Sequence, residues 1–150
     1  MSERIYTTSA LVIGERTSGE ASKVFTLFTR ELGLVYAYAR SVREVRSKLR
    51  YNLPLYSFTL VSLVAGREYW RIVGAEDSQG KVAPKICQTI CRFMGAHELH
   101  TDLFDELQAG GSDHLLTLSI FNHLGYIGKK VQSEREGERL IEQAIYVSHL

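Results

Sequence analysis

The chain has 150 residues, 45% of them hydrophobic, and its 18 Lys and Arg residues nearly balance 17 Asp and Glu residues. This size and composition permit one buried core or two small ones, and the presence of only two prolines argues against a disordered chain. Without an apolar run of roughly 20 residues, a secretion signal or more than two cysteines, the chain is expected to be reduced and cytoplasmic, with no membrane partner.

Five segments of the first half have the composition and alternation of β-strands. They are rich in β-branched and aromatic residues and lie at residues 5–16, 22–30, 33–40, 56–64 and 67–76. In the second segment, alternation places Phe25 and Leu27 on one face and Val24 on the other. Short connections join most of the strands, including a hairpin turn at residues 65–68.

The connection between the third and fourth strands is longer than the others. It runs over about residues 41–55, and "VREVRSKL" within it has the composition for one or two helical turns before Pro54 ends any helix. Five antiparallel strands with one long third crossing describe an OB-fold, which is a small, partly open barrel. A five-stranded SH3-like barrel fits the strand count about as well, but it explains the long crossing less readily.

The second half of the chain has helical periodicity. Pro84 is placed to begin a helix whose apolar positions recur at spacings of three and four as far as His97. A short helix is predicted at "DLFDEL", where the carboxylates of Asp102 and Asp105 in the first turn suit the helix dipole.

A third helix is predicted between Ser112, as its N-cap, and Gly125, as the residue after its end. Its apolar residues cover most of its circumference, so we expect these to be buried: Leu115, Leu116, Leu118, Ile120, Phe121 and Leu124. An amphipathic helix over residues 134–150 closes the chain. The elements together predict an α+β fold, with a five-stranded OB-fold barrel at residues 1–80 and a small all-helical domain at residues 81–150.

The most distinctive charged segment is "ARSVREVRSKLR", residues 39–50. It contains five cations against the single acid Glu44, and the cations are Arg40, Arg43, Arg46, Lys48 and Arg50. Such a run is often only a solvated charged surface. Here it lies at the crossing beside the face that OB-folds use for single strands, and it is flanked by Tyr36, Tyr38, Tyr51 and Tyr56.

Phosphate partners and stacking platforms therefore occur together in this part of the sequence. The pattern predicts that the five cations hold phosphates and that Tyr36 and Tyr38 stack bases. Arg16 and Arg67 are expected at loop tips, where they would extend the groove.

Candidate metal and catalytic patterns are weak. His97 and His100 in "HELH" do not match H-E-x-x-H, and no third ligand lies near them in sequence. Cys87 and Cys91 are four residues apart on a predicted helix and are interpreted as small buried hydrophobic residues. "GYIGKK" lacks the spacing of a phosphate-binding loop, and no nucleophile–base pair is evident. We predict no catalytic residue, no metal and no cofactor.

A set of motifs in the first eighty residues is characteristic of one family. They are the Gly19-Glu20-Ala21 turn, "LFTRELGLV", "ARSVREVRSKLR", Pro54 with Phe58 soon after it, and "GREYWRIVGAE". Together they resemble the N-terminal domain of RecO, the bacterial recombination mediator. A looser likeness continues through "HTDLFDEL" to "FNHLGY", so that the resemblance covers about residues 4–126.

The resemblance implies an OB-fold followed by a helical domain, in a protein that turns over no substrate. It also implies binding of single- and double-stranded DNA without sequence preference and annealing of complementary strands. The implied partners are RecR and the C-terminal tail of single-strand binding protein, with which the family loads RecA. The family's basic OB-domain segment corresponds here to Arg40, Arg43, Arg46, Lys48 and Arg50.

Many RecO proteins continue from Leu-Gly-Tyr into a cysteine-rich module, which is often zinc-binding. In this chain "GYIGKKVQSEREGERL" contains no cysteine. We therefore expect a shortened member of the family that lacks the zinc module.

Three functions are compatible with these patterns. The first is a non-catalytic DNA-binding and strand-annealing protein of recombinational repair. The second is an interaction adaptor with weak or no DNA binding, which docks RecR or the tail of single-strand binding protein; the acidic, phenylalanine-ended tail would take an apolar groove edged by cations. The candidate cations for that groove are Arg92, Lys129 and Lys130. The third is an RNA-binding OB-fold protein, because basic loops do not by themselves distinguish the nucleic acids.

Overall fold

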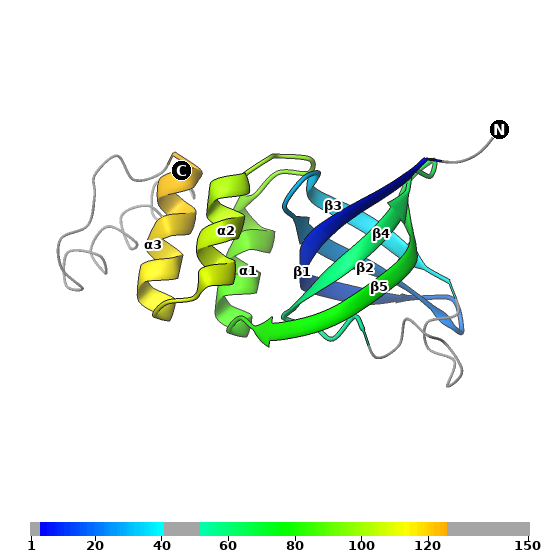
Figure 1. Cartoon of the computed structure of the whole chain (residues 1–150), viewed down its shortest axis with the longest axis horizontal. Coiled ribbons are helices and arrows are strands. Elements are labelled where there is room, and N and C mark those ends of the chain that lie inside the picture. Colours follow the sequence, from blue (N-terminus) through cyan, green and yellow to red (C-terminus); the bar gives the residue numbers. More distant parts are fainter. Residues whose placement is uncertain (1–3, 41–51, 126–150) are drawn as a thin grey trace.

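The computed structural model describes residues 4–40 and 52–125 of the chain. A β-barrel forms one end of the molecule, and three helices that stack beside it form the other end (Figure 1). The basic crossing at residues 41–51 and the predicted closing helix at residues 134–150 lie outside the described residues. Within the described part, no helix is long and apolar enough to cross a bilayer.

Five strands close the barrel. They are β1 (Ile5–Ser18), β2 (Ser22–Thr29), β3 (Gly33–Ala39), β4 (Ser57–Val64) and β5 (Trp70–Lys81). Their order around the barrel is β1-β2-β3-β5-β4, and β1 pairs with both β2 and β4. All pairs are antiparallel except β3 with β5, which is parallel. The predicted OB-fold is confirmed, and this arrangement favours it over the SH3-like alternative.

The fifth strand differs most from its prediction. We expected it at residues 67–76, but β5 begins at Trp70 and continues through the polar "EDSQGK" to Lys81. Its pairing with β4 shifts register at three places, and such bulges let a long strand bend while it keeps its ladder of hydrogen bonds. Glu76, Gln79 and Lys81 in this stretch are exposed, so their polar side chains remain solvated. The composition change near residues 76–81 therefore lies within a strand.

The two faces of the strands contribute to two separate apolar cores. The core inside the barrel includes Val12, Phe25, Leu27, Val35 and Leu63. The second core, which we call the junction core, lies between the outside of the barrel and the helices. It contains Leu11, Ile13, Phe28, Leu34 and Phe58 from the barrel side, with Ile86, Ile90, Leu103, Phe104 and Ile120 from the helices. The predicted alternation along β2 is confirmed, since Phe25 and Leu27 point inward and Phe28 points toward the helices.

The helices are α1 (Pro84–Phe93), α2 (Thr101–Ala109) and α3 (Asp113–His123). Pro84 begins α1 as predicted, but the extension of that helix to His97 was wrong. Past Met94 the chain turns, and His97 has a left-handed φ of 60° while its N–H donates to the carbonyl of Leu34 at 2.7 Å. This contact with the first residues of β3 takes the place of a further helical turn.

In α2 the first turn contains Asp102 but not Asp105, so the predicted dipole role of Asp105 was wrong. The carboxylate of Asp105 instead accepts two hydrogen bonds from Arg30, which lies between β2 and β3, at 2.8 and 3.1 Å. The contact joins α2 to the barrel beside the junction core.

The caps of α3 are confirmed. The Ser112 hydroxyl accepts from the N–H of Leu115 at 3.2 Å, and Gly125 follows the helix with a φ of 83°. Burial is confirmed for four of the six apolar residues of α3, namely Leu116, Leu118, Ile120 and Phe121. Leu124 is half-buried, and Leu115 is 56% exposed because α3 packs against α1 and α2 over only part of its circumference.

Candidate nucleic-acid interface

The outward face of β2 and β3 carries the predicted aromatic residues. Alternation directs the side chains of Val35, Ala37 and Ala39 into the barrel core, so Tyr36 and Tyr38 between them point outward. Tyr36 is 44% exposed and Tyr38 is half-buried. Both rings therefore lie on the surface that OB-folds use for single strands, where their side chains are available to solvent.

Register places further side chains beside these tyrosines. Tyr38 of β3 pairs with Val24 of β2, and Val24 pairs with Arg16 of β1. On the other side, Tyr38 is in register with Arg71 of β5. Since register partners in neighbouring strands point to the same side of a sheet, Arg16, Tyr38 and Arg71 lie in one row across the outward face. We call this the β2–β3 face.

Arg16 was predicted at a loop tip, but it lies within β1, which continues to Ser18. Its guanidinium donates a hydrogen bond from Nη2 to the hydroxyl of Tyr69, and its Cζ lies 5.6 Å from the centroid of the Tyr69 ring. Arg67 is in the turn between β4 and β5, as expected, and its side chain is exposed. Within residues 4–40 and 52–125, Arg67 has no ion pair.

Arg40 comes directly after β3 and is exposed, with no ion pair to any other residue in the described part of the chain. The other predicted phosphate-binding residues, Arg43, Arg46, Lys48 and Arg50, lie outside the described residues, as does Tyr51. Tyr56 was predicted as a flanking aromatic. It has a φ of 68°, and its ring packs against the junction core, so it is not on the β2–β3 face.

Charge around the β2–β3 face is mixed. Lys23 at the start of β2 binds Glu15 at 3.1 Å, and its register partner on β3 is Ala39. Glu20 and Glu68 are exposed in the two turns that border the face. A partly exposed pair such as Lys23 with Glu15 adds little stability, and because Ala39 faces the barrel core, Lys23 lies on the opposite side of the strands from Val24 and Tyr38. The free cations at this edge are therefore Arg40 and Arg67 among the described residues.

Sequence reasoning did not identify Tyr69 or Arg71 as residues of this face, and it placed Val24 opposite to Phe25 without giving it a role there. Alternation within β5 would have placed Arg71 outward, opposite to the buried Ile72. No local signal indicates that Tyr69 contacts Arg16, because 53 positions separate the two residues and barrel closure brings them together.

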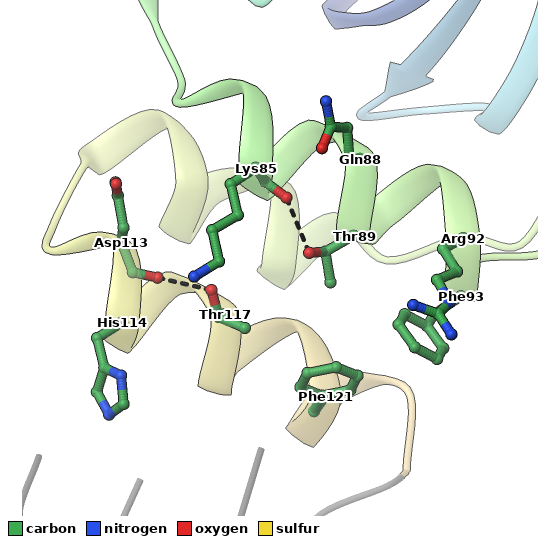
Figure 2. Close-up of a pocket in the computed structure, with 9 residues that line it drawn as sticks. All are labelled: Lys85, Gln88, Thr89, Arg92, Phe93, Asp113, His114, Thr117 and Phe121. Carbon is green, nitrogen blue, oxygen red and sulfur yellow. Dashed lines mark hydrogen bonds between the residues drawn. The ribbon is translucent and has the colours of Figure 1, made fainter. Parts of the chain in front are cut away.

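A second surface feature is a groove of about 510 Å³ between α1 and α3. Its lining includes the predicted partner-binding residue Arg92, together with Lys85, Gln88, Thr89, Phe93, Asp113, His114, Thr117 and Phe121 (Figure 2). The rings of Phe93 and Phe121 meet edge to face with centroids 5.0 Å apart, and Cζ of Arg92 lies 5.2 Å from the Phe93 centroid. Lys129 and Lys130, the other two predicted residues, lie outside the described residues.

The surroundings of His100, Cys87 and Cys91 do not indicate a metal or catalytic site. Nε2 of His100 lies 3.0 Å from Oε1 of Glu98, and no cluster of three or more metal-ligating side chains occurs in residues 4–40 and 52–125. Cys87 is buried as predicted, and burial raises the pKa of its thiol to about 12. Cys91 is exposed, contrary to prediction, although its sulfur lies 3.6 Å from the carbonyl oxygen of Ile13 and partial burial raises its pKa. Raised values keep both thiols protonated at neutral pH, which makes them poor nucleophiles and metal ligands.

Comparison with known proteins identifies the family. The family model described as the N-terminal domain of recombination protein O matches residues 1–79, which is more than half of the chain. A protein named DNA repair protein RecO from Dehalococcoides mccartyi is 34% identical over 74 residues, covering 49% of this chain and 29% of the relative. The protein of that name from Heliobacterium modesticaldum is 32% identical over 104 residues, covering 69% of this chain and 37% of the relative.

The chain therefore spans only about a third of the length of the relatives that it matches. The matched residues contain nearly all of the barrel, from β1 to most of β5, and the longer alignment covers more than the barrel alone. The closed five-stranded barrel, the aromatic β2–β3 face and these matches lead to one conclusion: the chain belongs to the recombination protein O (RecO) family.

Proposed function

We propose that this chain is a non-catalytic DNA-binding protein of recombinational repair, which binds single- and double-stranded DNA through the β2–β3 face and the basic segment that follows it. The observation that supports this most directly is the position of Tyr36 and Tyr38, which point outward from β3, with Arg16 in the same row as Tyr38 and the exposed Arg40 directly after the strand. The names of the relatives, which are DNA repair proteins, favour DNA as the ligand.

The chemistry of the two kinds of residue suits such a ligand. Arg and Lys neutralise phosphates and release counterions, whatever the base sequence, and this contribution is available to single strands and duplexes alike. Tyrosine rings accept any base by stacking, which requires a base whose face is uncovered. Neutralising the phosphates of two strands at one surface also lowers their mutual repulsion, so we propose that the chain promotes annealing and, with RecR, recombinase loading.

Charge reversal in the basic segment tests this proposal. A triple variant with Arg43→Glu, Arg46→Glu and Lys48→Glu should weaken binding to a fluorescent oligonucleotide by at least about tenfold and flatten the dependence of affinity on salt. The matched control reverses Lys81, Lys85 and Arg92, which changes net charge equally but lies on the helical side of the molecule. Equal affinity of the first variant and the wild type at low salt would refute the assignment. Competition with an RNA oligonucleotide of matched sequence measures the preference for DNA.

The groove between α1 and α3 supports a second candidate function, the docking of a partner protein. We propose that it takes an acidic peptide that ends in phenylalanine, the chemistry of the tail of single-strand binding protein. The apolar lining from Phe93 and Phe121 suits an aromatic side chain, and the cations of Lys85 and Arg92 suit carboxylates. Titration of the protein with such a peptide and with a DNA strand, each followed separately, ranks this function against DNA binding.

A further inference from the structure

The contact between Arg16 and Tyr69 crosses the β2–β3 face. Arg16 belongs to β1, whereas Tyr69 lies in the turn that leads into β5. Around the barrel, β2 and β3 lie between β1 and β5 on this side. The hydrogen bond from Nη2 of Arg16 to the Tyr69 hydroxyl therefore joins the two borders of the face by reaching over the strands between them.

The burial of Val24 supports this geometry. Val24 points outward from β2, in register with Arg16 and Tyr38, and it belongs to neither core described above. An outward valine in a solvated strand would be exposed, but Val24 is only 3% exposed. Side chains on the outer surface therefore cover it, and its register partners Arg16 and Tyr38 stand on either side of it.

Tyr69 also adds to the aromatic surface. Trp70, the next residue, is in register with Ala37 in the parallel β3–β5 pair, so Tyr69 comes level with Tyr36 on β3. Tyr69 is half-buried, and the guanidinium beside its ring holds it in place by a hydrogen bond and a cation–π contact. Three tyrosines, Tyr36, Tyr38 and Tyr69, thus border one outward surface.

We propose that Tyr69 is a base-stacking residue of this surface and that Arg16 is a positioning residue which holds its ring for that purpose. The pair selects single strands, because bases in a duplex are stacked on their neighbours and expose no face to a tyrosine. Phosphate contacts from the cations, by comparison, serve both forms of DNA. The inference rests on the proposed DNA-binding function and adds to it the residues that distinguish single strands from duplexes.

Removal of the ring tests the role of Tyr69. Loss of one stacked base typically weakens binding by roughly 5- to 150-fold, so Tyr69→Ala should raise the Kd for a single-stranded oligothymidylate by about tenfold or more. The Kd for a duplex of the same length should change less than about twofold. Tyr69→Leu, which keeps a large apolar side chain at this position, should behave like Tyr69→Ala, and it replaces that variant if the alanine protein fails to fold. Leu60→Ala, on the outward side of β4, is the control and should leave both Kd values unchanged.

A double-mutant cycle tests the role of Arg16. If Arg16 acts through Tyr69, Arg16→Gln should weaken single-strand binding while the slope of log affinity against log salt stays the same. The double variant Arg16→Gln with Tyr69→Ala should then be no weaker than Tyr69→Ala alone. Additive losses, with a slope lower by about 0.7, would instead make Arg16 an independent phosphate contact and overturn its positioning role.

The outcomes separate this inference from the proposed function. If the wild-type protein binds neither single strands nor duplexes, both are overturned. A different result is that the wild-type protein binds single strands and duplexes, and the two Tyr69 variants either lose affinity equally for the two forms or lose it for neither. In that case the proposed function stands, and the selection of single strands by Tyr69 is wrong.

Discussion

The guanidinium of Arg30 and the carboxylate of Asp105 form a two-pronged contact, with Nε to Oδ1 at 2.8 Å and Nη2 to Oδ2 at 3.1 Å. Arg30 lies in the turn between β2 and β3, and Asp105 lies on α2, so the contact joins the barrel to the helices. Nη1 of Arg30 also binds Glu31 at 2.6 Å, and the Thr101 hydroxyl lies 3.3 Å from the Arg30 carbonyl oxygen. This arrangement fixes the β2–β3 turn against the start of α2.

Removal of either partner should lower thermal stability modestly. Arg30→Gln and Asp105→Asn are each expected to lower Tm by roughly 1–4 °C, because exposed ion pairs contribute little even when their geometry is good. In a double-mutant cycle, the two losses should not add, since both variants remove the same contact. If the two losses of stability add fully, Arg30 and Asp105 do not interact in solution.

The Glu98 carboxylate should make stability depend on pH in the acidic range. Its pKa lies below the ordinary value of 4.5, first because it accepts the N–H of Gly95 at 2.8 Å and second because it lies beside His100. A lowered folded-state pKa means that the stabilisation is complete above the unfolded-state pKa and is lost as pH falls through the folded-state value. Glu98→Gln should therefore lower Tm by about 1–3 °C at pH 7 and by less at pH 3. A difference that stays constant from pH 7 to pH 3 would contradict the assignment.

Phe104 should couple the unfolding of the helices to that of the barrel. Its ring on α2 meets Phe28 of β2 and Phe58 of β4 edge to face, with centroids 5.4 and 5.6 Å apart, and it is completely buried. Phe104→Ala is expected to cost about 3–5 kcal/mol. The chain's single tryptophan, Trp70, lies in the barrel, so its fluorescence follows the barrel while far-UV circular dichroism also follows the helices.

In urea titrations of that variant, we expect both signals to shift to lower concentration together. A shift in circular dichroism alone would instead show that the predicted domains at residues 1–80 and 81–150 unfold independently. Val73→Ala, at an exposed position of β5, serves as the control and should leave both transitions nearly unchanged.

Arg40 should contribute to DNA affinity through phosphate alone. Arg40→Gln is expected to weaken binding to single strands and duplexes of any sequence and to reduce the single-strand salt slope by about 0.7. Lys81→Gln removes an equal charge at the end of β5 that leads into α1 and should leave the slope unchanged. An unchanged salt slope in the Arg40→Gln variant would show that Arg40 does not contact DNA phosphates.

Charge reversal in the groove between α1 and α3 should weaken peptide binding without weakening DNA binding. Lys85→Glu combined with Arg92→Glu is expected to raise the Kd for an acidic, phenylalanine-ended peptide by about tenfold or more, because like charges then face its carboxylates. Fluorescence polarisation with a labelled peptide measures this, and a scrambled peptide without the terminal phenylalanine is the matched ligand control. Unchanged peptide affinity would exclude the groove as the docking site.

Local patterns along the chain were sufficient to predict the five strands, the OB-fold and the ends of α3. The reason is that alternation in β2 and β3 and the caps at Ser112 and Gly125 depend on residues within a few positions of one another. The motifs that resemble RecO were also local, since each is a short run of the sequence, and the family match over residues 1–79 confirms the resemblance.

Contacts between distant residues were decided only by the tertiary structure. His97 leaves the helical path to bind Leu34, Asp105 turns to Arg30, and Arg16 reaches Tyr69, over separations of 53 to 75 positions in the chain. Closure of the barrel and packing of the helices beside it bring these pairs together, and no periodicity in the sequence records which side chains then face each other. The sequence by itself therefore determined the fold class, the family and the outward tyrosines of β3, whereas the tertiary structure alone decided how the borders of the candidate interface are joined.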